Sequence, residues 1–189
     1  MSSILKVDEI QNTDGKTGLV ITPDGSIDGI KFPEEANPSG RTITSTTMSS
    51  FEEGLFTPVL EGSVSNPTYS GSKGGRYTKI ASTVHFSAFV DVNPYTTDGS
   101  GELYFAGLPF TIDDDSGSGA GTRPVINVSI WGSTIGSGKH IAAQAVNSSK
   151  HLRFSIWGDN SAQTLWTYAT ALMSSGDAIY VQGHYYTTE

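Results

Sequence analysis

The four histidines are the side chains most able to bind a metal or transfer a proton, and their spacing favours neither role. His85, His140, His151 and His184 form no H-x-H or H-E-x-x-H pattern, so the sequence contains no local framework for zinc. Cysteine is absent, which excludes thiolate catalysis and cysteine-ligated metals. His85 and His184 fall on the polar side of their predicted strands, and we interpret both as ordinary polar-face residues.

Two segments are superficially similar to ligand-binding loops. Residues 133–140 (STIGSGKH) lack the first glycine of a phosphate-binding loop and carry histidine where its magnesium-binding Ser or Thr would stand, so we predict a hairpin loop. Asp113, Asp114 and Asp115 cluster oxygens that could chelate calcium. The downstream bidentate Glu of an EF-hand is missing, which favours a solvated loop over a dedicated site.

The remaining catalytic patterns are equally weak. No G-x-S-x-G nucleophile elbow occurs. The paired carboxylates Glu34–Glu35 and Glu52–Glu53 lie in or beside a predicted linker, which is a poor setting for a preorganised acid and base. We therefore predict no catalytic residues, no metal site, no cofactor and no enzymatic activity.

The amino-acid composition argues against several classes of binding partner. The net charge of −8 argues against a nucleic-acid surface, which needs a Lys/Arg footprint. No apolar run is long enough to cross a bilayer, and charge at Lys6 and Asp8 interrupts the apolar stretch that a signal peptide requires, so we expect a protein that is not membrane-inserted and not exported by the standard route. With 36% hydrophobic residues the core is modest, and a modest core often depends on association with other copies.

Strict alternation in two segments predicts half-buried strands. Val84, Phe86, Ala88, Val90 and Val92 share one face of the first segment, and His85, Ser87, Phe89 and Asp91 share the other. Near the end of the chain, Ile179, Val181 and Tyr185 alternate in the same way with Tyr180, Gln182, His184 and Tyr186. Both patterns place one apolar face against a core.

Further short apolar runs at 103–105, 125–131, 141–146 and 152–157 are separated by turn-rich clusters at 94–100, 113–121, 133–139 and 158–161. No helical pattern of useful length interrupts them. Many short strands at this spacing predict an all-β fold, an antiparallel sandwich or jelly roll.

The segment Val128–Gly132 (VSIWG) is repeated as Phe154–Gly158 (FSIWG). Two interpretations remain open. Either these are two strands in similar environments, or Trp131 and Trp157 both lie on a face that a neighbouring subunit covers or that a ligand reaches.

The chain divides into three predicted parts. Residues 1–32 contain short apolar runs separated by Asp14–Gly15 and Asp24–Gly25, which are strong hairpin signals, and this segment is too small to bury its apolar side alone. Residues 33–50 contain two prolines and a Ser/Thr run, as a linker does. Residues 51–189 form the β-rich head domain.

Two stretches resemble phage structural proteins. Residues 2–12 (SSILKVDEIQN), followed by 18–21 (GLVI) and 24–27 (DGSI), resemble the N-terminus of virion and tail-fibre proteins of marine and cyanobacterial phages. Residues 54–62 (GLFTPVLEG), 75–80 (GRYTKI) and 101–110 (GELYFAGLPF) are similar to C-terminal domains of phage tail fibres. The ending at 176–186 is similar to the last strand of such a domain, and also to trimeric C1q/TNF-like jelly rolls.

This resemblance implies a homotrimer at the surface of a phage particle. Its N-terminal segment would attach to tail, vertex or capsid proteins, with Leu5, Val7, Ile10, Leu19 and Ile21 as the attachment candidates. Its head would face outward. The aromatic residues on the second face exceed what a monomer comfortably exposes, and the trimer-interface candidates are Phe89, Tyr104, Trp131, Tyr180 and Tyr186.

A host-surface glycan is a plausible ligand of such a head, because aromatic rings stack on sugar faces and polar side chains bond hydroxyls. Tyr95, Trp157, Asp159 and Asn160, at or beside turns, are the candidates for this contact. Three functions compete. The first is a fibre or spike that contacts the host, the second a capsid decoration protein that stabilises the shell, and the third a polysaccharide-degrading tail enzyme.

Overall fold

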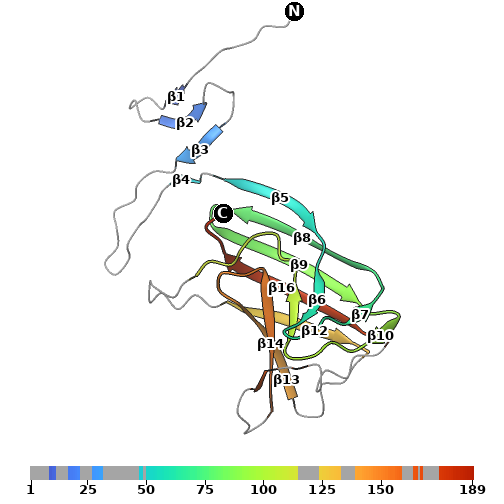
Figure 1. Cartoon of the computed structure of the whole chain (residues 1–189). Coiled ribbons are helices and arrows are strands. Elements are labelled where there is room, and N and C mark those ends of the chain that lie inside the picture. Colours follow the sequence, from blue (N-terminus) through green and yellow to red (C-terminus); the bar gives the residue numbers. More distant parts are fainter. Residues whose placement is uncertain are drawn as a thin grey trace, which may run out of the picture. The chain divides into compact units, whose positions relative to one another are not determined.

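The structure is a computed structural model that describes residues 9–11, 17–21, 27–31, 47–48, 50–114, 124–132, 139–158, 164–165, 167 and 175–189. Every element in these ranges is a strand, all the pairings are antiparallel, and no helix occurs among them (Figure 1). The predicted all-β antiparallel fold is therefore confirmed. Among the same residues, no helix has the length and apolar character of a membrane span.

The chain divides into two compact units, Met1–Glu52 and Glu53–Glu189. The first contains a four-stranded sheet in the order β1 (Glu9–Gln11), β2 (Thr17–Ile21), β3 (Ile27–Lys31) and β4 (Thr47–Met48). The attachment candidates Ile10 and Leu19 are directly paired in β1 and β2, and Ile21 pairs with Ile27. β4 falls inside the predicted linker 33–50, so regular structure extends into that range.

The second unit is built on one long sheet. Its strands follow the order β5 (Phe51–Phe56, from Glu53 within this unit), β8 (Lys73–Ile80), β9 (Thr83–Asp91), β16 (Ala178–Tyr186), β12 (Val125–Trp131), β13 (Lys139–Ala145), β14 (His151–Gly158), β11 (Leu103–Ala106) and β6 (Val59–Gly62). Short β15 (Thr164–Leu165) pairs with β14. A separate pair joins β7 (Thr68–Tyr69) to β10 (Tyr95–Thr97).

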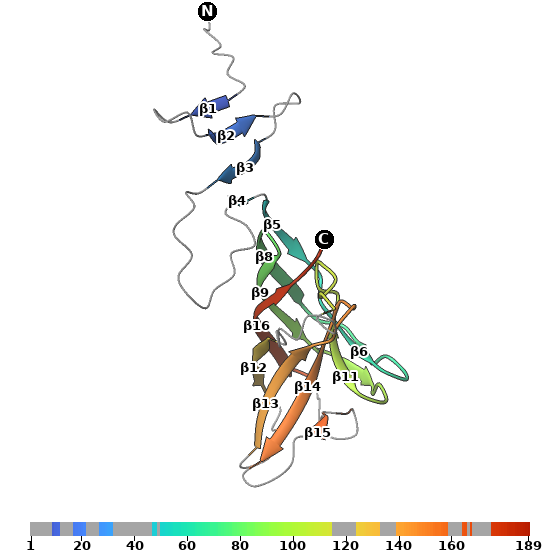
Figure 2. The same ribbon diagram turned by 90° about the vertical axis from the view of Figure 1, so that its left-hand side faces the viewer.

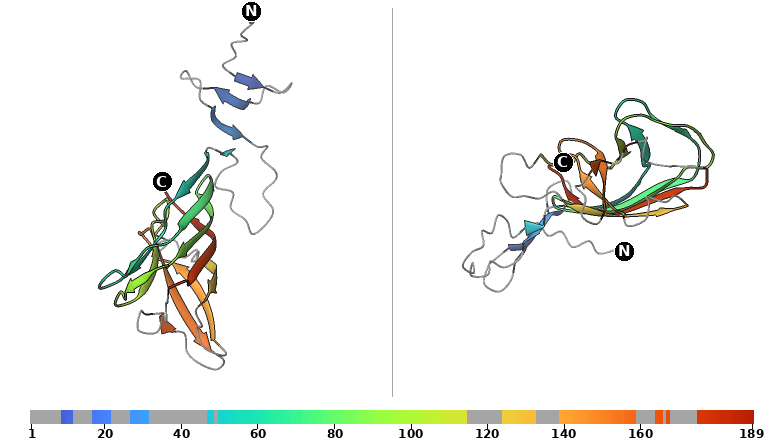
Figure 3. Two further views of the ribbon diagram at one scale, coloured as in Figure 1. Left: turned by 90° about the vertical axis from the view of Figure 1, so that its right-hand side faces the viewer. Right: turned by 90° about the horizontal axis from the view of Figure 1, so that it is seen from below.

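This sheet curls over its own apolar side. β12 is the corner, because Val125 and Ile126 pair with β13 while Asn127–Trp131 pair with β16. Figure 2 shows β13 and β14 beside β6 and β11 on one side and β9 and β16 on the other, and Figure 3 shows the curved wall end-on. The jelly-roll and C1q/TNF-like arrangement stays a prediction.

Period-two alternation puts the core on the inner side of the curl. In β9, Val84, Phe86, Ala88 and Val90 are buried while His85 and Ser87 are exposed, which confirms the predicted faces. β16 follows the same rule, with Ile179, Val181 and Tyr185 inside. These residues meet apolar side chains from β6, β11 and β14, including Leu60, Phe105, Leu152 and Phe154. Each large buried side chain stabilises the fold by roughly 1.5–3 kcal/mol.

Six strands of the head were not predicted individually, namely β5, β6, β7, β8, β10 and β15. β8 was missed because Gly74 and Gly75 weaken the strand signal, and β15 and β7 are only two residues long. The predicted turn cluster 94–100 was wrong in part, because β10 forms a short strand there against β7.

Aromatic rings cover glycines between β5 and β8. The Tyr77 ring lies over Gly54, where an added Cβ would stand 2.6 Å from the Tyr77 hydroxyl, and the Phe56 ring covers Gly75 in the same way. Phe56 is itself packed edge-on against Phe86, with ring centroids 6.4 Å apart, so its ring has little room to yield. Such ring-over-glycine contacts are a known means of fixing strand register.

We predict that Gly75→Ala destabilises the head by about 1–3 kcal/mol, because the new methyl group overlaps the Phe56 ring. Gly74→Ala is the matched control, since its methyl would meet the Phe89 ring at an ordinary 3.7 Å. It should leave stability within about 1 kcal/mol of the parent. Urea unfolding followed by circular dichroism measures both, and equal effects of the two changes would contradict the covering role of Phe56.

Tyr185 connects β16 to the segment after β11. Its side chain is fully buried, and its hydroxyl accepts a hydrogen bond from the Phe110 amide and donates one to the Phe110 carbonyl, both at 3.2 Å. Burial raises the pKa of this phenol well above its ordinary value. The neutral phenol is therefore the form that the fold stabilises.

We predict that Tyr185→Phe lowers the free energy of unfolding by about 1–2 kcal/mol at neutral pH, because the Phe110 amide and carbonyl lose their partner. The difference from the parent should be constant below about pH 10, the ordinary tyrosine value, and should shrink above it, where the parent alone has to keep Tyr185 protonated. Exposed Tyr180→Phe is the control and should be nearly neutral. Denaturant unfolding at several pH values checks both statements.

Candidate functional site

The outward side of β5, β8, β9, β16 and β12, which we call the outer face, carries the residues best placed for contact. The strand pairing arranges them in rows. Phe89 of β9 lies opposite Tyr180 of β16, which lies opposite Ser129 of β12. Ser87, Gln182 and Asn127 form the next row, and His85 and His184 the one after it. One row is thus aromatic, the second polar and the third imidazole-bearing.

The aromatic row is partly exposed. Phe89 and Tyr180 stack with ring centroids 6.0 Å apart and ring planes inclined by 24°. Tyr180 is 47% exposed, and Trp131, two residues beyond Ser129 in β12, is 72% exposed. We call Phe89, Tyr180 and Trp131 the aromatic band. A shallow hollow of about 510 Å³ next to it is lined by Phe89, Tyr180 and the exposed Leu55 of β5, among others.

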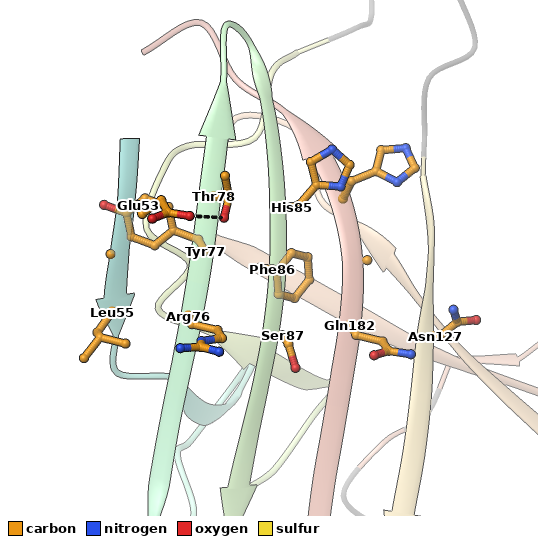
Figure 4. A pocket seen from close by; sticks show the side chains of 13 residues that line it. Glu53, Leu55, Arg76, Tyr77, Thr78, His85, Phe86, Ser87, Asn127 and Gln182 are labelled. Carbon is orange, nitrogen blue, oxygen red and sulfur yellow. Dashed lines mark hydrogen bonds between the residues drawn. The ribbon is translucent and has the colours of Figure 1, made fainter. Parts of the chain in front are cut away.

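A larger hollow of about 800 Å³ occupies the polar and imidazole rows, and we call it the polar depression (Figure 4). Its volume lies in the range of roughly 300–1,000 Å³ that small-ligand sites have. The side chains that line it come from five strands and include Glu53, Arg76, Thr78, His85, Ser87, Asn127, Gln182 and His184.

Two contacts organise the polar depression. His85 and His184 are directly paired across β9 and β16, and the centroids of their rings lie 5.7 Å apart. The Thr78 hydroxyl donates a hydrogen bond to Oε1 of Glu53 at 3.4 Å. Among the lining residues, Glu53 is the only carboxylate. The arrangement offers hydrogen-bond donors and acceptors in register, together with a guanidinium and two imidazoles.

The structure brings some of the predicted interface residues together and separates others. Phe89, Tyr180 and Trp131 form the aromatic band, while Tyr186 lies beyond the imidazole row and packs edge-on against His184, with centroids 6.0 Å apart. Tyr104 belongs to the other half of the sheet. Its ring stacks on His151, with centroids 5.6 Å apart, and its hydroxyl donates to Glu102 at 2.8 Å.

The surroundings of Tyr104 form a small network of their own. His151 Nε2 lies 3.3 Å from Glu61 Oε2. Desolvation, with the nearby Glu102 carboxylate, raises the pKa of the Tyr104 phenol. Tyr104 is thus held by neighbours in its own chain, in contrast to the exposed Trp131.

The predicted ligand candidates are only partly described. Trp157 is half-buried and stacks on His140, with centroids 5.9 Å apart. It therefore differs from the exposed Trp131, so the repeated VSIWG and FSIWG segments place their tryptophans in unlike environments. Tyr95 begins β10, but its side chain, like Asp159, Asn160, Leu5 and Val7, lies outside the described residues.

The acidic segment is described only through Asp114. The Asp113 amide donates to the Tyr186 carbonyl at 2.8 Å, and Asn147 donates to the Asp114 carboxylate at 3.2 Å. Within the described ranges, no three His, Asp or Glu side chains gather as a metal site would need. Asp115 lies outside those ranges, so the solvated loop at this segment stays a prediction.

Sequence reasoning missed the polar depression. It placed His85, His184, Ser87 and Gln182 on the outward side of their strands, but only the register shows that they adjoin. Arg76 was missed because it belongs to β8, which was not predicted as a strand.

No protein-family model matches the chain, and no curated protein matches it significantly. Among solved structures, its fold is similar to part of the Dettilon tailspike protein, with a TM-score of 0.57 and 21% sequence identity. The match covers 71% of this chain and 23% of that one. Because residues 1–52 make up little more than a quarter of the chain, most of the matched part belongs to Glu53–Glu189. At this identity the likeness concerns the fold, and this chain spans about a quarter of the tailspike chain.

Proposed function

We propose that this chain is a structural component of a phage particle, a tail-associated spike or fibre whose β head is displayed for contact. The likeness of the head to part of a tailspike protein supports this proposal. The N-terminal and C-terminal sequence stretches that resemble virion and tail-fibre proteins support it independently, because they were identified without the fold. The marine or cyanobacterial origin belongs to the same proposal and rests on the N-terminal stretch alone.

The observation that carries the proposal furthest is the aromatic band. A stacked Phe89–Tyr180 pair beside a tryptophan that is 72% exposed is an unusual surface for a monomer, since large exposed aromatics normally mark interfaces. We propose that neighbouring copies cover this band in a homotrimer. Closed cyclic symmetry lets one patch on each copy meet a complementary patch on the next.

The N-terminal unit is proposed as the attachment segment. Its short sheet pairs Ile10 with Leu19 and Ile21 with Ile27, and strands of this length need a partner surface for stability. Other virion proteins of the tail, vertex or capsid would supply that surface. The protein would then lie at the surface of the particle.

We propose that the head binds without catalysing a reaction. Glycoside cleavage generally needs two carboxyl groups placed across the scissile bond. In the polar depression, Glu53 is the single carboxylate among the lining residues, and it accepts a hydrogen bond from Thr78. The depression therefore favours recognition over cleavage. Neither nucleic acid nor a cofactor has a role in this proposal.

We predict that the purified full chain has three times the monomer mass by light scattering at micromolar concentration. The double change Trp131→Ser and Tyr180→Ser should shift it towards monomer, because it removes most of the exposed aromatic surface of the band. Val64→Ser is the control, since Val64 is also a largely exposed apolar residue but lies off the outer face, and it should leave the trimer intact. Unchanged circular dichroism verifies folding, and a parent that stays monomeric would refute the trimer.

The number of copies per particle distinguishes a spike from a capsid decoration protein, which is the main alternative. A tail-associated trimer should be present in few copies per particle on a quantified stained gel, whereas a capsid decoration protein should be present in hundreds. Release of reducing ends from host polysaccharide, in an assay validated with an active depolymerase, would instead support a tail enzyme and would contradict the proposal.

A further inference from the structure

The middle of the outer face carries an ordered polar row. Arg76 of β8 lies opposite Ser87 of β9, which lies opposite Gln182 of β16, which lies opposite Asn127 of β12. All four side chains are exposed, and Figure 4 shows them in one line across the strands. Neighbouring strands are about 4.8 Å apart, so the row presents hydrogen-bonding groups at regular intervals.

The chemistry of the row is mixed. Gln182 and Asn127 each offer a donor and an acceptor, Ser87 offers both through one hydroxyl, and Arg76 offers only donors. A ligand that matches this set must itself carry many donors and acceptors along an extended shape. Polyhydroxylated chains have this property, and the length of one sugar unit is comparable to the strand spacing.

The charge of the polar depression contrasts with that of the whole chain. The chain carries a net charge of −8, whereas the depression is lined by one guanidinium, that of Arg76, one carboxylate, that of Glu53, and the imidazoles of His85 and His184. Glu53 already accepts a hydrogen bond from Thr78. Arg76 is therefore placed to bind a carboxylate, since a guanidinium presents two parallel N–H groups to it.

The aromatic band borders this row directly. Phe89 and Tyr180 occupy the positions two residues from Ser87 and Gln182, on the same side of their strands. Their stacked rings provide an apolar edge, and the side of that edge that neighbouring copies leave open can pack against the C–H face of a sugar ring. A polar row with an aromatic edge favours a ligand that has both hydroxyl groups and an apolar face.

We propose that the polar depression binds an acidic oligosaccharide that lies across strands β8, β9, β16 and β12. Its carboxylate bonds to Arg76, and its hydroxyls bond to Ser87, Gln182 and Asn127. The site rests on the proposed function, because it names the ligand class that a displayed head would contact. It differs from the turn residues that the sequence suggested, and it lies at the edge of the band that neighbouring copies cover.

The test uses the full chain and isothermal titration calorimetry with two acidic probes, oligogalacturonate and oligosialic acid, and a neutral oligogalactose. The acidic probes should bind and the neutral one should bind at least about tenfold more weakly, as the loss of a charge-assisted hydrogen bond implies. Arg76→Gln should weaken acidic binding by about tenfold or more. The double change Gln182→Ala and Asn127→Ala should weaken it without a change in net charge.

Lys139→Gln is the matched control. Lys139 is an exposed cation of β13, outside the depression, and its loss changes net charge as Arg76→Gln does. It should leave binding unchanged. Equal losses in the two variants would indicate non-specific attraction and overturn the site, as would failure of both acidic probes to bind.

Light scattering on the same variants distinguishes this site from the trimer. If Arg76→Gln dissociates the trimer and no probe binds the parent, a second copy occupies the depression. That result overturns the saccharide site and leaves the trimer standing. If instead the parent is monomeric but binds acidic probes through Arg76, the site stands and the trimer fails.

Discussion

The head depends on a single sheet burying its own apolar side. β12 pairs with β13 through its first residues and with β16 through the rest, so one strand belongs to both halves of the curl. Phe86 and Tyr185 from one half then meet Phe105 and Phe154 from the other in a common core. Neither half could bury these rings alone, because each would leave a complete apolar face in water.

Because the core is built from the inward-pointing residues, the outward-pointing positions are free for contact. Residues that point inward are constrained by close packing, where even one added methylene is costly. The outward rows of β8, β9, β16 and β12 carry no such restriction, and they hold both the aromatic band and the polar depression. A rigid sheet keeps the rows in register, which gives the face a defined pattern of apolar and polar groups.

The sequence predicted the strands that have an alternating pattern or a short apolar run, and it missed those with a weaker apolar signal. β9 and β16 were identified with the correct faces because Val84 to Val90 and Ile179 to Tyr185 follow a period of two. β8 was missed because Gly74 and Gly75 leave its first half without apolar side chains, and the Phe56 ring that covers Gly75 comes from another strand. The curl could not be read from the chain, since it depends on pairings between distant segments.

The same reasoning explains what was found of the candidate site. Parity alone placed Phe89, Tyr180, His85 and His184 outward, but which of them adjoin depends on strand register. Tyr104 shares their outward parity and yet stacks on His151 in the other half of the sheet, because parity does not say to which half a strand belongs. Predicting the polar row would have required the register of four strands relative to one another. Periodicity along the sequence gives the face on which a residue lies, but it does not give this register.

The position of β16 determines when the sheet of the head can be completed during translation. It lies between β9 and β12, and its neighbour β9 precedes it by more than eighty residues in the sequence. While the residues before 178 are still being synthesised, β9 and β12 therefore lack the strand that joins them, and the core lacks Ile179, Val181 and Tyr185. Unpaired strand edges and exposed apolar side chains make the nascent head prone to aggregation during that interval.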